Sequence, residues 1–138
     1  MIDPFVGAWE LDPSTLAYEH GRPGKRAVYV VEALADGLVF RLEYDDADGK
    51  PAQVEYGGPL DGSEQPLAGA PGLALVLLRD GPRSIESRLL RDGAVIDRWT
   101  REISADGERM EVTQHVAKPG GGVLLNRSTY RRLHGERG

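Results

Sequence analysis

The strongest candidates for a functional site in this chain are three side chains at alternate positions of the stretch 94–103, namely Asp97, Trp99 and Arg101. In an extended strand, alternate side chains point to the same face. A carboxylate, an indole and a guanidinium would therefore lie in one row. If that face is turned inward, the row is a polar anchor in an otherwise apolar cavity, because buried charges are costly unless they are compensated. If the strand is twisted or bulged, both charges face solvent.

The other candidates for metal or catalytic chemistry form no recognised pattern. His20, His115 and His134 lack the spacing of a metal site. Residues 45–49 resemble part of a calcium loop, but Tyr44 occupies the first position, where a carboxylate is needed. The chain has no cysteine, which excludes disulfides and thiolate ligands. We therefore expect no metal and no cofactor.

Turns of one kind divide the chain into short segments. The dipeptide Asp-Gly, which supplies the positive φ angles of a tight hairpin turn, occurs six times. Between these turns, apolar and polar residues alternate with the period of two that marks half-buried strands. No stretch of useful length shows helical periodicity. The best candidate, residues 13–20, is short and is expected to form one turn of helix or an irregular crossing loop. Strands are predicted over 5–11, 26–34, 38–45, 51–58, 63–67, 73–79, 83–91, 94–103, 108–117 and 123–133.

Consecutive strands joined by tight turns lie side by side, so the segments form an antiparallel up-and-down meander. Exposed strand edges invite aggregation, which favours closure of the meander. The sequence therefore predicts an all-β fold closed into a barrel of about eight to ten strands. A flat open sheet is the weaker alternative.

Strand alternation also selects residues for the barrel interior. Where the apolar face of a strand points inward, the interior contains Phe40, Leu42, Tyr44, Val54, Tyr56, Met110, Val112 and Gln114. The stretch 26–34 is apolar on both faces, and no facing is assigned to it. The candidate ligand-binding residues are Phe40, Tyr44, Tyr56, Asp97, Trp99, Arg101 and Gln114.

Length and charge limit the possible partners. The 138 residues, with a net charge of −5, suit one domain over 1–138. Outside a short basic stretch at the C-terminus there is no clustered basic stripe, so nucleic acid is not expected. The longest apolar run, Leu73 to Leu78, is shorter than the ~20 residues of a membrane helix. The first residues show no signal sequence, so a cytoplasmic location is expected. A homodimer is compatible with the sequence.

Two segments at opposite ends of the chain carry a family resemblance. Phe5-Val6-Gly7-Ala8-Trp9 contains a G-x-W motif, and Thr129-Tyr130-Arg131-Arg132 lies in the last predicted strand. They resemble the first and closing strands of the calycins, the superfamily of lipocalins and fatty-acid-binding proteins. The turns at Asp61-Gly62 and Asp106-Gly107 are similar to those of small bacterial lipocalin-like proteins. The resemblance covers nearly the whole chain and implies a calycin-like barrel whose cavity holds a small, largely apolar molecule.

The resemblance further implies a role for Trp9 and a facing for Ile103. In calycins an arginine of the closing strand packs across the tryptophan of the first. Arg131 and Arg132 are both candidates for this arginine. Alternation along the strand favours Arg132, because it lies on the same face as Tyr130. Such a cation–π contact contributes about 0.5–2 kcal/mol and would close one end of the barrel. Ile103 resembles an inward apolar position, which also turns the row at 97, 99 and 101 inward.

Three functions are compatible with this reading. The first is binding of one small hydrophobic or amphipathic molecule in the barrel, with an acid held by Arg101. The second is an enzyme that isomerises, cyclises or hydrolyses an apolar substrate, with Asp97, Tyr44 or Tyr56 as the acid–base group. The third is a barrel with a filled interior that acts through its surface.

Overall fold

The computed structural model describes residues 3–19, 26–46, 48–67, 69–118 and 120–134. Within these ranges the chain forms strands and no helix, so it contains no helix that could cross a membrane. The strands are β1 (Gly7–Tyr18), β2 (Ala27–Leu34), β3 (Gly37–Asp45), β4 (Pro51–Pro59), β5 (Asp61–Pro66), β6 (Leu73–Arg79), β7 (Ser84–Arg91), β8 (Ala94–Ile103), β9 (Arg109–Ala117) and β10 (Val123–Leu133).

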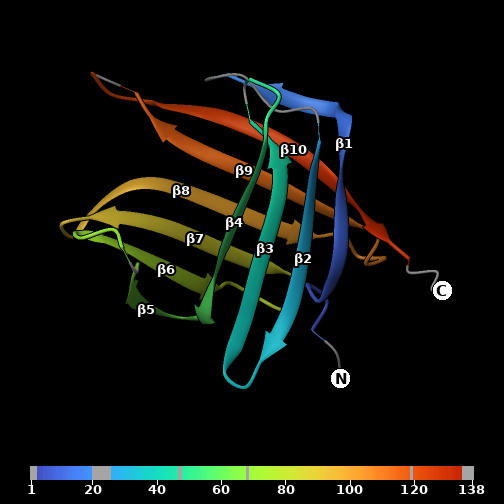
Figure 1. The fold of residues 1–138 in the computed structure, drawn as a ribbon, viewed down its shortest axis with the longest axis horizontal. Helices are drawn as coiled ribbons and strands as arrows, with labels where there is room; N and C mark the ends of the chain where they lie inside the picture. The colour runs from blue at the N-terminus through green and yellow to red at the C-terminus, as the bar shows by residue number, and fades with distance from the viewer. Residues whose placement is uncertain (1–2, 20–25, 47, 68, 119, 135–138) are drawn as a thin grey trace.

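All the strands belong to one antiparallel sheet in the order β4-β3-β2-β1-β10-β9-β8-β7-β6-β5. β1 pairs with both β2 and β10, which joins the beginning of the meander to its end. Figure 1 shows β2, β3 and β4 crossing steeply over β6, β7, β8 and β9, so the sheet curls around an interior. The predicted all-β meander, closed into a nearly complete barrel, is confirmed.

Closure is incomplete at one place, which we call the seam. β4 and β5 are consecutive in the chain but stand at opposite ends of the strand order, and no ladder of hydrogen bonds joins them. A backbone hydrogen bond from Arg79 to Leu60 holds the turn between them against β6. The barrel is therefore closed on all sides except along β4.

The turn at Asp92-Gly93 shows how the sequence sets the strand boundaries. Arg91 and Ala94 are cross-strand partners, so the turn has only these two residues. Their φ angles are 50° and 86°. Positive φ at both positions is the requirement of a type I′ turn, whose twist matches that of the flanking strands.

The first strand is longer than the sequence predicts. It continues to Tyr18, so the expected helical turn or crossing loop over 13–20 is wrong for residues 13–18. Glu19 follows the strand, and His20 lies outside the described residues. A bulge separates the β10 partners of Asp12 and Ala17. The Thr15 hydroxyl spans it by accepting a hydrogen bond from the Thr129 backbone N–H at 2.9 Å. Pairing with β10 therefore resumes after the bulge, which a local pattern cannot indicate.

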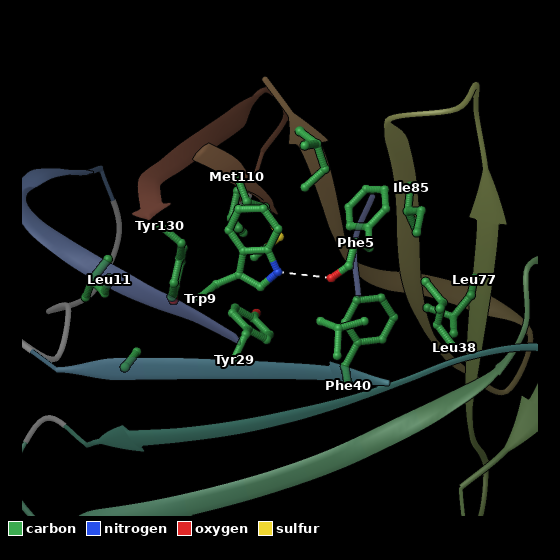
Figure 2. Packing of buried hydrophobic residues seen from close by; sticks show 14 of the residues in the cluster. Phe5, Trp9, Leu11, Tyr29, Leu38, Phe40, Leu77, Ile85, Met110 and Tyr130 are labelled. Atoms are coloured by element: carbon green, nitrogen blue, oxygen red, sulfur yellow. Dashed lines mark hydrogen bonds between the residues drawn. The ribbon is translucent and has the colours of Figure 1, made fainter. Parts of the chain in front are cut away.

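Part of the interior is filled by a cluster of buried apolar side chains, and we call it the packed half. Its members are large apolar side chains with almost no exposure: Phe5, Trp9, Leu38, Phe40, Leu77, Ile85 and Met110. In Figure 2 the Trp9 indole lies at the centre of this cluster, with Phe5 and Met110 beside it. Its Nε1 donates a hydrogen bond to the Phe5 carbonyl at 3.0 Å, so a buried polar atom is satisfied.

Candidate functional site

Arg101 is the most unusual residue of the interior. It projects from β8 and is only 2% exposed. Its Nη1 donates to the Ser87 Oγ at 2.5 Å, and its Nη2 donates to the Tyr29 Oη at 3.4 Å and to the Tyr56 Oη. Its guanidinium carbon lies 4.8 Å from the centre of the Phe40 ring. The cation is thus held by hydroxyl groups and aromatic faces.

No carboxylate compensates this charge within the described ranges. The ion pairs found there all involve other arginines or His134. The Nε of Arg101 is buried and has no hydrogen-bond partner among the described residues. Burial alone lowers the pKa of Arg101, but the facing Tyr56 and Tyr29 hydroxyl groups outweigh it, and the pKa lies above its ordinary value. The group therefore remains a cation.

The tyrosine that contacts Arg101 remains a neutral phenol. Desolvation raises the pKa of Tyr56 far above its ordinary value, although Arg101 opposes this shift. A hydroxyl can accept one hydrogen bond and donate another. Because Tyr56 accepts from the guanidinium, its own proton is directed elsewhere.

A cavity of about 290 Å³ lies against this cluster. We call this part of the interior the hollow half. Its wall is mainly apolar, with Arg101, Ser87, the tyrosines and Glu55, which forms an ion pair with Arg41, as the polar contribution. The lining residues are Tyr29, Leu42, Val54, Glu55, Tyr56, Leu67, Leu75, Ser87, Leu89, Trp99 and Arg101.

The cavity reaches the seam. Val54 pairs with Leu42 across β3 and β4, and both line the cavity. Val54 is nevertheless 40% exposed. Leu67 and Leu75, which follow β5 and lie on β6, line the cavity from the other side of the seam.

The structure brings together some of the residues that the sequence nominates and separates others. Tyr56, Trp99 and Arg101 line the cavity. Phe40 lies in the packed half, stacked on the Tyr56 ring with centroids 5.4 Å apart. Phe40 therefore packs against Tyr56 and Arg101 on the side away from the cavity. Tyr44 packs against the core and is not among the lining residues.

Asp97 and Arg101 do not form one joint anchor. The Asp97 Oδ2 accepts a hydrogen bond from the Gln114 Nε2 at 2.9 Å. The Gln114 Oε1 accepts one from the Asn126 Nδ2 at 3.1 Å. Asp97 is half-buried, whereas Arg101 is fully buried, so the alternative in which both charges face solvent is wrong for Arg101.

Two residues of the cluster are absent from the sequence-based set. Ser87 is the cross-strand partner of Trp99. The alternation of Ile85, Ser87 and Leu89 against charged neighbours is a signal that could have found it. Tyr29 could not be assigned, because the residues around it are apolar on both faces.

The two ends of the chain meet at Trp9. The guanidinium carbon of Arg132 lies 4.2 Å from the Trp9 ring centre. Arg131, the competing candidate, pairs instead with Asp12 on the outer surface at 3.0 Å. The contact is structural, because Trp9 lies in the packed half and not along the cavity.

Comparison with known proteins defines the fold. No family model matches the sequence, and no curated protein matches it. Among solved structures, the wild-type fluorescent protein UnaG aligns with 96% of this chain and 100% of its own, with a TM-score of 0.66 and 21% identity. Zebrafish ileal bile acid-binding protein, complexed with cholic acid, aligns with 94% of this chain and 99% of its own, with a TM-score of 0.58 and 15% identity. These neighbours are of the fatty-acid-binding-protein type, and the chain has this calycin-like fold.

Proposed function

We propose that the protein binds one small amphipathic acid inside the barrel, with the apolar part in the cavity and the anionic group on Arg101. The observation that carries this proposal is a fully buried guanidinium, on the wall of a mainly apolar cavity, without a carboxylate partner among the described residues. An uncompensated buried charge is costly. An anion supplied by a ligand would remove that cost.

The donors around the cavity suit a carboxylate. Arginine offers a planar fork of N–H donors that matches the two oxygens of this group. The Nε of Arg101 is the donor that lacks a partner among the described residues. The neutral Tyr56 hydroxyl, which accepts from Arg101, can direct its own proton to the same anion.

The size of the cavity favours a compact ligand. Its 290 Å³ is near the lower end of the roughly 300–1,000 Å³ that is usual for small-molecule sites. The cholic acid complex of the zebrafish neighbour, an amphipathic acid in a protein of the same fold, supports the class of ligand.

Trp99 provides the test, because it lines the cavity. Its fluorescence is titrated with decanoate and with decanol, which share a chain and differ in charge. Decanoate is expected to bind, and decanol at least about tenfold more weakly, because hydrogen bonds to charged groups contribute about 1.5–3 kcal/mol. The variant Trp99→Phe, which keeps only Trp9 as fluorophore, should lose the response.

Arg101→Met should reduce decanoate affinity by roughly tenfold to a hundredfold. The variant is expected to fold, since an apolar side chain can replace a buried ion without loss of stability, and circular dichroism verifies this. Arg98→Met is the matched control, because Arg98 lies on the outer face of the same strand and pairs with Glu86; it should bind normally. Equal binding of acid and alcohol, or unchanged binding by the Arg101 variant, would contradict the proposal.

An enzymatic use of the same cavity has less support. The raised pKa of Tyr56 keeps its proton in place at neutral pH, so it is unsuited to act as a base. Asp97 is hydrogen-bonded to Gln114 and the Arg98 backbone. Asp97 is therefore not paired with Arg101, and Tyr56, which accepts a hydrogen bond from Arg101, keeps its own proton.

A further inference from the structure

A band of polar side chains crosses the inner wall of the barrel beyond Trp99. It consists of Asp97 on β8, Gln114 on β9 and Asn126 on β10. Gln114 is the cross-strand partner of both Trp99 and Asn126, so these side chains share the inner face. Asn126 is only 4% exposed. Asp97 and Gln114 are half-buried.

The band adjoins the cavity. Asp97 is the cross-strand partner of Leu89, and Leu89 lines the cavity. Trp99 lines it as well and is the next inward residue along β8. The inner face of β8 thus presents the Arg101 cation, the Trp99 indole and the Asp97 carboxylate in sequence.

The hydrogen bonds of the band run in one direction. The Glu19 backbone N–H, which can only donate, donates to the Asn126 Oδ1 at 3.0 Å. Asn126 then donates to Gln114, and Gln114 donates to Asp97. An ionised carboxylate only accepts. These bonds therefore end at Asp97, whose Oδ1 also accepts from the Arg98 backbone N–H at 3.0 Å. Because each carboxylate oxygen can accept more than one hydrogen bond, a group on a ligand that meets Asp97 would be a hydrogen-bond donor.

The spacing determines where that donor would lie. Arg101 and Asp97 are four residues apart on one strand, and at about 3.3 Å per residue this is about 13 Å, which a saturated chain of about ten carbon atoms spans. Trp99 stands between them and would contact the apolar middle of the ligand.

We propose that the ligand is an acid with a hydroxyl group at its far end, and that Asp97 is the residue that selects for this hydroxyl. The inference rests on the proposed function, because it takes the anion to be on Arg101. It goes beyond that function by distinguishing a ligand that is polar at both ends from a simple fatty acid.

The test compares decanoate with ω-hydroxydecanoate by Trp99 fluorescence and calorimetry. The native protein should bind the hydroxy acid about fivefold or more tightly than decanoate, since a hydrogen bond to a charged acceptor outweighs the loss of hydration. Asp97→Leu should reverse this preference while it retains decanoate binding. Glu102→Leu, which removes an exposed acid from the same strand, is the control and should keep the native preference.

The outcomes separate this inference from the function on which it rests. If decanoate binds in an Arg101-dependent manner but the hydroxyl brings no gain, the role of Asp97 is wrong and the proposed function stands. If Asp97→Leu weakens both acids by the same factor, Asp97 is structural and the inference is again overturned. If neither acid binds the native protein, the proposed function fails. Reversal of the preference by Asp97→Leu alone supports the inference.

Discussion

Arg132 ties the beginning and the end of the described chain together at the scale of single residues. Besides its contact with Trp9, it donates hydrogen bonds to the carbonyls of Gly107, Val6 and Pro4 at 2.8, 2.9 and 2.7 Å. Charge-assisted hydrogen bonds of this kind are stronger than neutral ones. A single guanidinium therefore fixes the entry of the chain into β1, the β8–β9 turn and β10 at once.

Gly7 is the residue that gives this guanidinium its space. Its φ is +136°, which side chains rarely adopt, and a Cβ added there would lie 2.7 Å from the Arg132 Nη1. Because three carbonyls hold Arg132, it cannot move aside without losing hydrogen bonds. Gly7→Ala should lower the free energy of unfolding by about 2 kcal/mol or more, measured by urea denaturation.

Gly93→Ala is the control for this prediction. Gly93 also has a positive φ, of +86°, but a Cβ added there meets nothing within 4 Å. Gly93→Ala should therefore lower the free energy of unfolding only by the cost of placing alanine at a positive φ, about 1 kcal/mol. Equal losses in the two variants would show that the space beside Arg132 is not what Gly7 provides.

At the scale of elements, one side-chain device recurs at the bulge of β1, at the start of β5 and in the β8–β9 turn. The carboxylates of Asp12, Asp61 and Asp106 each accept a hydrogen bond from a nearby serine hydroxyl at 2.6 Å. These bonds hold the pKa of each aspartate below its ordinary value. The charged form of each aspartate therefore stabilises its turn.

This device predicts a pH dependence of stability. Because the pKa is lowered in the folded state, the ionised aspartate makes its full contribution to stability above the pKa of aspartate in the unfolded chain, about 3.9. It is then lost as the pH falls through the lower folded pKa. For Asp106, the causes are the hydrogen bonds from the Ser104 hydroxyl and the Glu108 backbone. Urea denaturation of Asp106→Asn and the native protein should therefore differ most near neutral pH and converge below about pH 4.

Ser104→Ala removes the first of these hydrogen bonds and should weaken the same pH dependence. A native stability that does not change between neutral pH and about pH 3 would contradict the role assigned to these turns.

Regular turns and alternation were sufficient to predict most strands. Asp92-Gly93, for example, specifies a turn type and the pairing of the residues beside it, whereas the register shift between Leu89 and Leu90 was not predicted. The continuation of β1 past Pro13 was not predictable, because a long-range hydrogen bond from Thr129 to Thr15 sustains it. The position of the seam could not be predicted either, since closure of the barrel depends on the twist and stagger of the whole sheet rather than on a local pattern.

The same limits apply to the candidate site. Alternation along β8 placed Trp99 and Arg101 on one face, which the structure confirms, but alternation alone left open whether that face points inward. It could not show that Phe40 is buried beneath Tyr56, or that Asp97 is hydrogen-bonded to Gln114 and not to Arg101. Those relations depend on how distant strands approach one another.

At the scale of the whole molecule, the seam makes one side of the barrel weaker than the rest. β4 is hydrogen-bonded to β3 on one edge and has no ladder on the other, whereas β9 is paired on both edges. Amide hydrogen exchange reports the free energy of such local opening. Amides of β4 should therefore exchange faster than those of β9, as measured by mass spectrometry or NMR on the unliganded protein. Equal protection of the two strands would mean that the barrel is closed along β4 in solution.

The division of the interior into a packed half and a hollow half has an evolutionary consequence. The side chains around Trp9 are fully buried, whereas Leu42 and Leu89, which line the cavity, are only half-buried. Substitutions at Leu42 or Leu89 can then accumulate while the cluster around Trp9 keeps the barrel folded. The shape of the cavity could therefore change one residue at a time in a chain that remains a barrel throughout.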